Sequence, residues 1–236
     1  MRAIILAGGK GTRLRPYTYS LPKPLMPIGG EIPILGIILK QLKNHSFDEV
    51  TITVNYMARI IQSFFEDGKD WGLKIDYSLE KKMLGTVGPL TLIKNLPKTF
   101  LVMNGDLLTD LDFKKFFEWH IKNDNDISVA TFKRMSQNDS GVLYFDDERN
   151  IYDFKEKPIE YHNISMGIYV LNKSIIEDLP KNEKIGFDQL ILDAIKNKLK
   201  IKAYPHTSYW LDIGCNSDYE KANDYFIQNR SQFLDL

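Results

Sequence analysis

The chain has few of the features that mark a secreted, membrane or nucleic-acid-binding protein. Its 236 residues include one cysteine, Cys215, so an internal disulfide is excluded and a reducing compartment is favoured. Lysine plus arginine and aspartate plus glutamate number 31 each, which leaves no excess charge for binding a polyanion. No apolar run reaches the length of a membrane span, and the short apolar N-terminus has no signal-peptide cleavage site. We therefore expect a cytoplasmic protein without a nucleic acid or membrane partner.

Histidine is also sparse, and neither it nor cysteine suggests a site. The four histidines are scattered and lack the spacing of metal ligands, so we expect them to be structural or solvated. A lone thiol more often behaves as a small apolar side chain than as a catalytic group, and we expect no chemistry from Cys215. The histidines concerned are His45, His120, His162 and His206.

The glycines near the N-terminus match neither of two common nucleotide-binding patterns. A P-loop requires G-x-x-x-x-G-K-[ST], but the sixth position is Arg13 when counted from Gly8 and Leu14 when counted from Gly9. A dinucleotide fingerprint, G-x-G-x-x-G, fits Gly9 and Gly11 but meets Leu14 at its third glycine. This mismatch argues against a nicotinamide-dependent oxidoreductase, which stays open as an alternative.

What the N-terminus does contain suits a phosphate ligand. Residues 2–7 form an apolar run with β-branched isoleucines, as in a buried parallel strand. The glycines that follow let the backbone turn sharply and bring its N–H groups close to a ligand. Arg13, Arg15 and Lys23 add three cations near this turn. Peptide donors with fixed positive charge favour a triphosphate, although a plain strand-to-loop turn is the alternative.

The first half of the chain alternates between strand and helix patterns. We expect strands at 2–7, 49–55, 73–78 and 99–104, and helices at 33–44, 58–66 and 88–96. Such alternation implies right-handed βαβ units. The predicted fold class is therefore α/β, with a doubly wound, Rossmann-like and mainly parallel sheet.

In the second half the pattern changes to strand after strand. We expect strands at 126–133, 141–145, 151–155 and 165–171, forming an antiparallel or mixed region laid over one side of the sheet. Further expected elements are helices at 113–122, 174–179, 188–196 and 216–228 and strands at 199–204 and 209–213, with Ser174 and Asn216 or Ser217 as helix caps. Because there is no linker, repeat or low-complexity tract, we expect a single domain over 1–236.

Two aspartates suit a magnesium ion. Asp106 follows an expected strand, and ligands of open α/β sheets bind beyond the carboxyl ends of strands. Asp212 lies between apolar residues, where a carboxylate needs a partner. Together they would give Mg²⁺ two oxygens, with phosphates and waters completing the octahedron. The alternatives are a common Asn-Gly-Asp turn for Asp106 and a buried salt bridge for Asp212.

Several motifs together resemble the sugar nucleotidyltransferases, which join a sugar 1-phosphate to a nucleoside triphosphate and release pyrophosphate. The run L-A-G-G-K-G-T-R-L-R-P at residues 6–16 is followed by P-K-P-L-M-P-I-G at 22–29. The resemblance continues through L-G-T at 84–86, N-G-D at 104–106, E-K-P at 156–158 and W-L-D-I-G at 210–214, so it covers almost the whole chain. The chain looks most similar to hexose and heptose 1-phosphate guanylyltransferases, without the repeat-rich C-terminal domain of longer relatives.

The resemblance implies a role for each matching residue. Residues 1–110 would be the nucleotide-binding half and residues 111–236 the sugar-phosphate-binding half. Arg13, Lys23 and Asp106 would be catalytic, and Asp106 and Asp212 would bind Mg²⁺. The nucleotide would be bound by Leu6, Ala7, Gly8, Gly9, Gly11, Thr12, Arg13, Lys23, Glu80, Gly85 and Thr86. The sugar phosphate would be bound by Asn104, Gly141, Glu156, Lys157 and Ser165.

The identity of the base depends on Glu80. A carboxylate can accept from the ring N–H and the amino group of guanine together, whereas thymine and uracil present one N–H between two carbonyls. This favours GTP, with thymidylyl, cytidylyl and uridylyl transfer as alternatives, and with a surface role for Glu80 also open. Val87, Ser165 and Cys215 depart from common residues of the family, and Ser165 leaves the sugar undecided. A catalytically silent nucleotide-sugar-binding regulator and a homo-oligomer also stay open.

Overall fold

The protein is described by a computed structural model that covers residues 1–234. Its strands are β1 (Arg2–Leu6), β2 (Pro27–Ile28), β3 (Ile32–Pro33), β4 (Glu49–Val54), β5 (Lys74–Leu79), β6 (Thr99–Asn104), β7 (Leu107–Thr109), β8 (Ile127–Gln137), β9 (Val142–Phe145), β10 (Ile151–Lys155), β11 (Ile159–Asn172), β12 (Ile201–His206) and β13 (Trp210–Asp212).

The α-helices are α1 (Ile34–Asn44), α2 (Ala58–Phe65), α3 (Phe113–Lys122), α4 (Ser174–Glu177), α5 (Phe187–Lys196), α6 (Asn216–Gln228) and α7 (Arg230–Leu234). Short 3-10 helices are η1 (Thr12–Leu14), η2 (Tyr17–Tyr19), η3 (Lys23–Leu25), η4 (Lys69–Trp71) and η5 (Gly88–Leu92).

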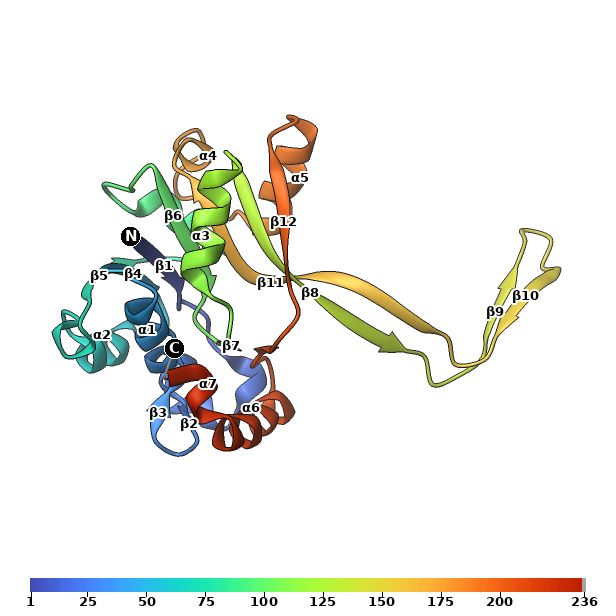
Figure 1. The fold of residues 1–236 in the computed structure, drawn as a ribbon, viewed down its shortest axis with the longest axis horizontal. Helices are drawn as coiled ribbons and strands as arrows, with labels where there is room; N and C mark the ends of the chain where they lie inside the picture. The colour runs from blue at the N-terminus through green and yellow to red at the C-terminus, as the bar shows by residue number, and fades with distance from the viewer. Residues whose placement is uncertain (235–236) are drawn as a thin grey trace.

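A seven-stranded sheet forms the centre of the molecule, in the order β12-β8-β11-β6-β1-β4-β5 (Figure 1). Strands β5, β4, β1 and β6 pair in parallel, and β8 pairs in parallel with β12. Strand β11 is antiparallel to both of its neighbours, β6 and β8. The expected α/β class and mainly parallel sheet are confirmed, and the carboxyl ends of β1, β4, β5 and β6 lie at one edge.

Helices cover both faces of this sheet, as a doubly wound fold requires. On one face, apolar side chains of α1, α2 and α3 pack against alternate residues of β1, β4 and β6, such as Ile5, Ile52 and Met103. On the other face η5, α4 and α5 pack against residues that include Ile4 and Val102. A third cluster joins α6 and α7 to α1 and to the loop that precedes it. The apolar runs of the strands are therefore buried on two sides, which explains why they do not alternate with polar residues.

The second half of the chain corrects one expectation. Strands β8 and β11 belong to the main sheet rather than to a region laid over one side of it. Beyond the sheet they continue as a two-stranded ribbon that projects from the body and ends in the separate β9–β10 hairpin (Figure 1). Both strands are longer than expected, because the pairing runs on to Gln137 and Ile159 through exposed, mostly polar residues.

Two of the expected helix caps are also wrong. Helix α4 has Lys173, not Ser174, at its N-cap, with no side-chain hydrogen bond there. Helix α6 is capped by Cys215, whose backbone N–H and thiol both lie against the carboxylate of Asp218, at 3.1 and 3.0 Å. The single thiol therefore serves a helix terminus.

Candidate active site

The glycine loop after β1 is held in a defined conformation. The Gly105 N–H donates to the Leu6 carbonyl at 2.9 Å, so the loops after β1 and β6 are tied together. Gly11 has φ +60°, a left-handed conformation that favours glycine, and its carbonyl accepts from the Thr18 hydroxyl at 2.8 Å. A Cβ at Gly11 would lie 3.0 Å from the Thr18 methyl group. These contacts hold the loop in place at the carboxyl edge of the sheet.

A cavity of 240 Å³ lies beneath this loop. It is lined by Leu6, Ala7, Gly9, Gly11, Thr12, Arg13, Lys23, Pro24, Gly105, Asp106 and Gly214. The residues come from three stretches that are far apart in sequence, namely the glycine loop with η3, the N-G-D turn after β6 and the D-I-G turn after β13. Eight of the sequence-predicted site residues therefore meet in one place, as the motifs implied.

Two oppositely charged side chains meet inside this cavity. The ammonium of Lys23 forms an ion pair with Asp106 Oδ2, and Lys23 is only 9% exposed. A buried lysine requires such a partner, because an isolated charge would lose its hydration. Asp106 Oδ1 is also buried, yet it has no hydrogen-bond partner within residues 1–234. The site thus holds a carboxylate oxygen with free accepting capacity.

Asp212 is brought to the same place by a short antiparallel ladder. Strands β7 and β13 pair with Asp212 opposite Leu107, and the Ile213 N–H donates to the Asp106 carbonyl at 3.1 Å. Burial raises the pKa of Asp212, and repulsion from Asp106 raises it further, while Lys23 and Arg13 oppose both effects. Arg13 lies close by, since a Cβ on Gly214 would be 3.3 Å from its guanidinium nitrogens.

These residues fit a magnesium ion. Two neighbouring carboxylates, one with an unpartnered buried oxygen, supply the hard oxygen ligands that Mg²⁺ prefers. Within the described part of the chain, no three His, Cys, Asp or Glu side chains are grouped so as to hold a metal alone. This also agrees with Mg²⁺, which keeps waters and is commonly held by one or two carboxylates together with substrate phosphates.

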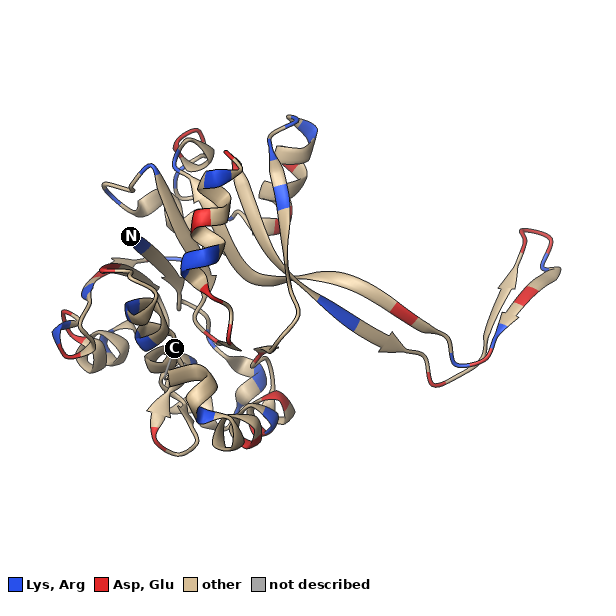
Figure 2. Cartoon of the chain, viewed as in Figure 1, with Lys and Arg blue, Asp and Glu red and all other residues tan. Residues whose placement is uncertain are grey.

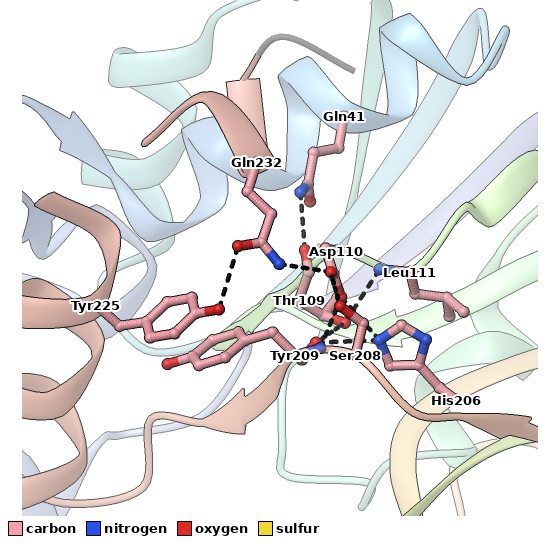
Figure 3. Close-up of polar contacts among 9 residues, drawn as sticks. All are labelled: Gln41, Thr109, Asp110, Leu111, His206, Ser208, Tyr209, Tyr225 and Gln232. Atoms are coloured by element: carbon pink, nitrogen blue, oxygen red, sulfur yellow. Dashed lines mark hydrogen bonds and ion pairs between the residues drawn. The ribbon is translucent and has the colours of Figure 1, made fainter. Parts of the chain in front are cut away.

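A buried carboxylate fixes the ladder that carries Asp212 (Figure 3). Asp110, directly after β7, accepts from His206 Nε2 at 2.8 Å and from the Tyr209 N–H at 2.9 Å. It also accepts from Gln232 Nε2 at 2.6 Å and from the Ser208 hydroxyl. Burial alone would raise the pKa of Asp110, but these donors together hold it well below its usual range. Asp110 thus joins β7 to the β12–β13 turn and to α7.

Glu80 lies just after β5, beneath the glycine loop. It is 6% exposed, its Oε2 accepts from the Leu84 N–H at 3.2 Å, and a Cβ on Gly8 would lie 2.6 Å from Oε1. Burial raises the pKa of this carboxyl, and the Leu84 N–H opposes the rise. The alternative of a surface role for Glu80 is therefore wrong.

Gly85 and Thr86 hold the loop that follows Glu80 against the other half of the chain. A Cβ on Gly85 would lie 2.4 Å from the Ile185 carbonyl oxygen, and Gly85 has φ +81°. The Thr86 hydroxyl accepts from the Phe187 N–H at 3.1 Å. Both residues thus have a packing role in this structure, in addition to the nucleotide contact that the motif implies.

The residues expected to bind the sugar phosphate are not all brought together. Asn104 ends β6, and a Cβ on Gly167, two residues after Ser165, would lie 2.5 Å from its side-chain nitrogen. These residues lie at the root of the ribbon. Gly141 and Glu156 are neighbours on the projecting hairpin, where a Cβ on Gly141 would lie 3.0 Å from Glu156 Oε2. Lys157 directly follows Glu156, in the short connection from β10 to β11, and is not among the residues that line the cavity.

The comparisons with known proteins agree with this arrangement. The family model described as Nucleotidyl transferase matches residues 2–229. The chain belongs to the nucleotidyl transferase family.

Curated nucleotidyltransferases similar to this chain act on sugar 1-phosphates. The D-glycero-alpha-D-manno-heptose 1-phosphate guanylyltransferase of Campylobacter jejuni subsp. jejuni serotype O:2 is 36% identical, over 93% of this chain and 97% of its own length. The UTP--glucose-1-phosphate uridylyltransferase of Synechocystis sp. is 34% identical over 94% of this chain, which spans 62% of that relative. The mannose-1-phosphate guanylyltransferase of Mycobacterium tuberculosis is 30% identical over 94% of this chain, which spans 63% of that relative.

A solved nucleotidyltransferase-like structure shares the fold. The crystal structure of HddC from Yersinia pseudotuberculosis, complexed with GMP-PN, superposes with a TM-score of 0.72 and 29% identity, over 95% of this chain and 99% of that one. The family and the enzyme class expected from the motifs are confirmed. Among the described residues, no helix is long and apolar enough to cross a membrane.

Some parts of this nucleotidyltransferase site were missed by the sequence motifs. Gly105 and Gly214 line the cavity and lie inside the N-G-D and D-I-G motifs, so the signal for them was present. Thr18 supports the site through a hydrogen bond to Gly11, and Asp110 supports it through hydrogen bonds to His206 and Gln232, far away in sequence. No local pattern marks either residue. A larger cavity of 1140 Å³ beside β5 contains none of Arg13, Lys23 or Asp106 among its lining residues.

Proposed function

We propose that this nucleotidyltransferase transfers a guanylyl group from GTP to a sugar 1-phosphate and releases pyrophosphate, with Mg²⁺ held by Asp106 and Asp212. The observation that carries the proposal is the convergence of the glycine loop, Arg13, Lys23 and Asp106 on one cavity, with Asp212 close beside them. A catalytically silent regulator would not need this cluster. The resulting nucleotide sugar would serve glycan or surface polysaccharide synthesis in the cytoplasm.

The reaction requires positioning and charge neutralisation more than proton transfer. An oxygen of the sugar 1-phosphate attacks the α-phosphorus of the triphosphate, and the bond to the pyrophosphate oxygen breaks. Because the attacking oxygen is already anionic, no general base or covalent intermediate is needed. When bound, Mg²⁺ neutralises the phosphate oxygens on which negative charge gathers. Arg13 and Lys23 would neutralise the same oxygens and hold them in line.

Lys23 has a second task in this proposal. In the structure its ammonium forms an ion pair with Asp106 Oδ2, so each of these two partly buried charges has an opposite charge beside it. With a triphosphate in the site, Asp106 would hold the cation, and the Lys23 ammonium would turn to the phosphate oxygens. The buried position of Lys23 between Pro22 and Pro24 limits how far its backbone can move.

Glu80 supports the guanine assignment. Each carboxylate oxygen can accept two hydrogen bonds, so the Leu84 N–H leaves Glu80 with accepting capacity. It lies against Gly8, a residue of the loop that would bind the nucleotide in this proposal. The relatives named as guanylyltransferases support the same base, whereas the relative named as a uridylyltransferase makes UTP the second candidate.

For the sugar we propose a 1-phosphate of the manno series, a heptose or mannose. The support is the wording of the relatives' names, since two of them act on manno-configured sugars. Asn104 and Ser165 would face the sugar from the body, while Gly141, Glu156 and Lys157 would contact its hydroxyls and phosphate.

The deciding experiment is a matrix of nucleotides against sugar phosphates. We would measure kcat/KM by pyrophosphate release for GTP, CTP, dTTP, UTP and ATP, each with mannose, heptose and glucose 1-phosphate. We expect GTP with a manno-configured sugar to give the highest value. A higher value for UTP with glucose 1-phosphate would overturn the guanine assignment and leave the enzyme class unchanged.

A further inference from the structure

The ribbon made by β8 and β11 starts at the active site and leads away from it. Near its root the pairing register shifts between Ser165 and Tyr169, where Gly167 has φ +72° and the strand bends. From Ser165 opposite Thr131 the ladder continues to Ile159 opposite Gln137 without a further shift. The β9–β10 hairpin follows at the far end (Figure 1).

This geometry separates two groups of residues that one sugar phosphate would need. Lys157 lies eight residues before Ser165 in the sequence, just ahead of the start of β11 at Ile159. At about 3.3 Å per residue, an extended strand carries it about 26 Å from the root of the ribbon. Reacting groups must approach to about 3–3.5 Å. While the ribbon is extended, Lys157 therefore cannot contact a substrate bound in the cavity of its own chain.

The hairpin is nevertheless built as a specific unit. Gly141 allows the Phe154 ring and the Glu156 carboxylate to lie against its backbone, since a Cβ there would be 2.6 and 3.0 Å from them. Lys157 has φ +44°, a conformation that L-residues rarely adopt and that often marks functional positions.

The ribbon and hairpin also expose an unusual amount of apolar surface. Eight large side chains are each more than half exposed: Met135, Leu143, Phe145, Ile151, Tyr152, Phe154, Ile159 and Tyr161. At roughly 100 Å² each they offer about 800 Å², which is one side of a standard protein interface. An isolated two-stranded hairpin is only marginally stable in water. We therefore expect these apolar side chains to be buried against another protein surface.

We propose that two copies of the chain exchange these arms, so that the hairpin of each copy supplies Gly141, Glu156 and Lys157 to the active site of its partner. The proposal rests on the proposed function, because that function assigns the three residues to the sugar phosphate. The partner is a second copy because only another such body offers a site that lacks these residues. A two-fold axis makes the exchange reciprocal and closed, so each dimer contains two complete sites.

The charges of the arm favour this partner over a strongly charged one. Lys155 and Lys157 alternate with Asp153, Glu156 and Glu160, so neither sign dominates along the arm (Figure 2). A nucleic acid would require a cationic surface, and the formal net charge of the whole chain is zero. An apolar surface with mixed charge suits a second copy of the chain.

The test is complementation between two inactive variants, Asp106→Asn in the body and Lys157→Ala on the exposed hairpin. Each variant alone should lose at least about 90% of the pyrophosphate release with sugar 1-phosphate. In a co-expressed one-to-one mixture, half of the dimers are mixed and each mixed dimer has one intact site. The mixture should therefore recover about a quarter of wild-type activity. Activity of the mixture that stays at the level of the single variants overturns the exchange.

A matched mixture serves as the control. Arg13→Ala and Asp106→Asn both change the body, so every site of a mixed dimer lacks one of the two residues and no recovery is expected. Recovery in this mixture as well would show that mixing itself restores activity, and the exchange would then be rejected.

A second measurement does not need activity, so the exchange can fail or succeed separately from the proposed function. In a Cys215→Ser background, which keeps a helix-capping side chain, Thr12→Cys and Lys157→Cys are combined and treated with a bismaleimide. Light scattering should give twice the mass of one chain, and the linked product should be a covalent dimer on a denaturing gel. A monomer, or a dimer whose links all lie within one chain, overturns the proposal.

Discussion

At the scale of single residues, the two aspartates of the cavity give the sharpest test of the metal site. Asp106→Asn and Asp212→Asn each remove one of the two proposed anionic ligands while keeping the shape of the side chain. We expect each to lower kcat by at least about a hundredfold, because the charge that stabilises the transition state is lost. Pyrophosphate release over a range of Mg²⁺ concentrations measures this. Glu118→Gln, an exposed change on α3, is the control, and near-normal rates for both aspartate variants would contradict the assignment.

Alanine substitutions at Gly8 and Gly9 distinguish a glycine that is needed for stability from one that is needed for nucleotide binding. A Cβ on Gly9 would have no other atom within 4 Å, so Gly9→Ala should leave the free energy of unfolding within about 0.5 kcal/mol. The same methyl group would enter the cavity, and we expect kcat/KM for GTP to fall at least about tenfold. Gly8→Ala should reduce stability as well, because its Cβ would lie 2.6 Å from Glu80 Oε1. Unchanged kinetics for Gly9→Ala would show that the triphosphate does not approach this backbone.

Residues whose role depends on a local motif could be predicted from the sequence. Arg13, Lys23 and Asp106 lie in short patterns, and the structure places all three at one cavity. The pairing of Lys23 with Asp106 could not be predicted, because the two residues are 83 positions apart and neither pattern refers to the other. The depth of burial of Glu80 was equally hidden beside two lysines.

At the scale of elements, Asp110 determines how firmly the β7–β13 ladder is attached. Asp110→Asn replaces an acceptor of four hydrogen bonds with a group that also carries two donors. We expect a loss of roughly 1–3 kcal/mol in the free energy of unfolding. Ser208→Ala removes one donor from the same carboxylate and should cost less, about 1 kcal/mol. Urea unfolding at neutral pH measures both changes.

The same variant predicts a pH dependence. Because the folded protein holds the pKa of Asp110 below its ordinary value of 3.8, the carboxylate contributes stability that is fully present above pH 3.8. This contribution is lost as the pH falls from there through the lowered pKa. The difference in unfolding free energy between wild type and Asp110→Asn should therefore be constant above about pH 5 and shrink below about pH 4. A difference that grows on acidification would contradict the depressed pKa.

Long buried elements were predictable, whereas the short ladder of β7 and β13 was predicted only on the β13 side, at residues 209–213. Strands β1, β4 and β6 are apolar runs of five or six residues, and their positions agree with the sequence pattern. Strands β7 and β13 have three residues each and exist because each supplies the other's hydrogen bonds. No local pattern reveals such a pair, although it is this pair that brings Asp212 to Asp106.

At the scale of the whole molecule, the arrangement of the second half was the least predictable feature. The sequence predicts its strands, but the direction in which β8 and β11 leave the sheet depends on the bend at Gly167 and on what covers the exposed ribbon. If another copy of the chain covers the ribbon, the direction of β8 and β11 is determined by the dimer and not by a single chain. The motifs could therefore assign residues 141 and 156 to the sugar-phosphate site, but they could not predict how these residues reach it.

Binding of the nucleotide should stabilise the whole chain and report the base without any knowledge of the sugar. A ligand at about one hundred times its Kd adds about 2.7 kcal/mol to the free energy of unfolding. For a chain of this size, that corresponds to a rise of about 5–10 °C in Tm. If guanine donates two hydrogen bonds to the Glu80 carboxylate as proposed, GTP is favoured over UTP or dTTP by about ten- to a hundredfold. UTP and dTTP should then give clearly smaller shifts at equal concentration.

Two variants make this thermal measurement decisive. Glu80→Gln should reduce the advantage of GTP, because an amide offers a single acceptor oxygen where the carboxylate offers two. Asp106→Asn should lower the Mg²⁺-dependent part of the shift for every nucleotide alike, since it acts on the phosphates rather than on the base. If UTP stabilised the wild-type chain as much as GTP, or if Glu80→Gln left the order of the nucleotides unchanged, Glu80 would not read the base and the guanine assignment would be wrong.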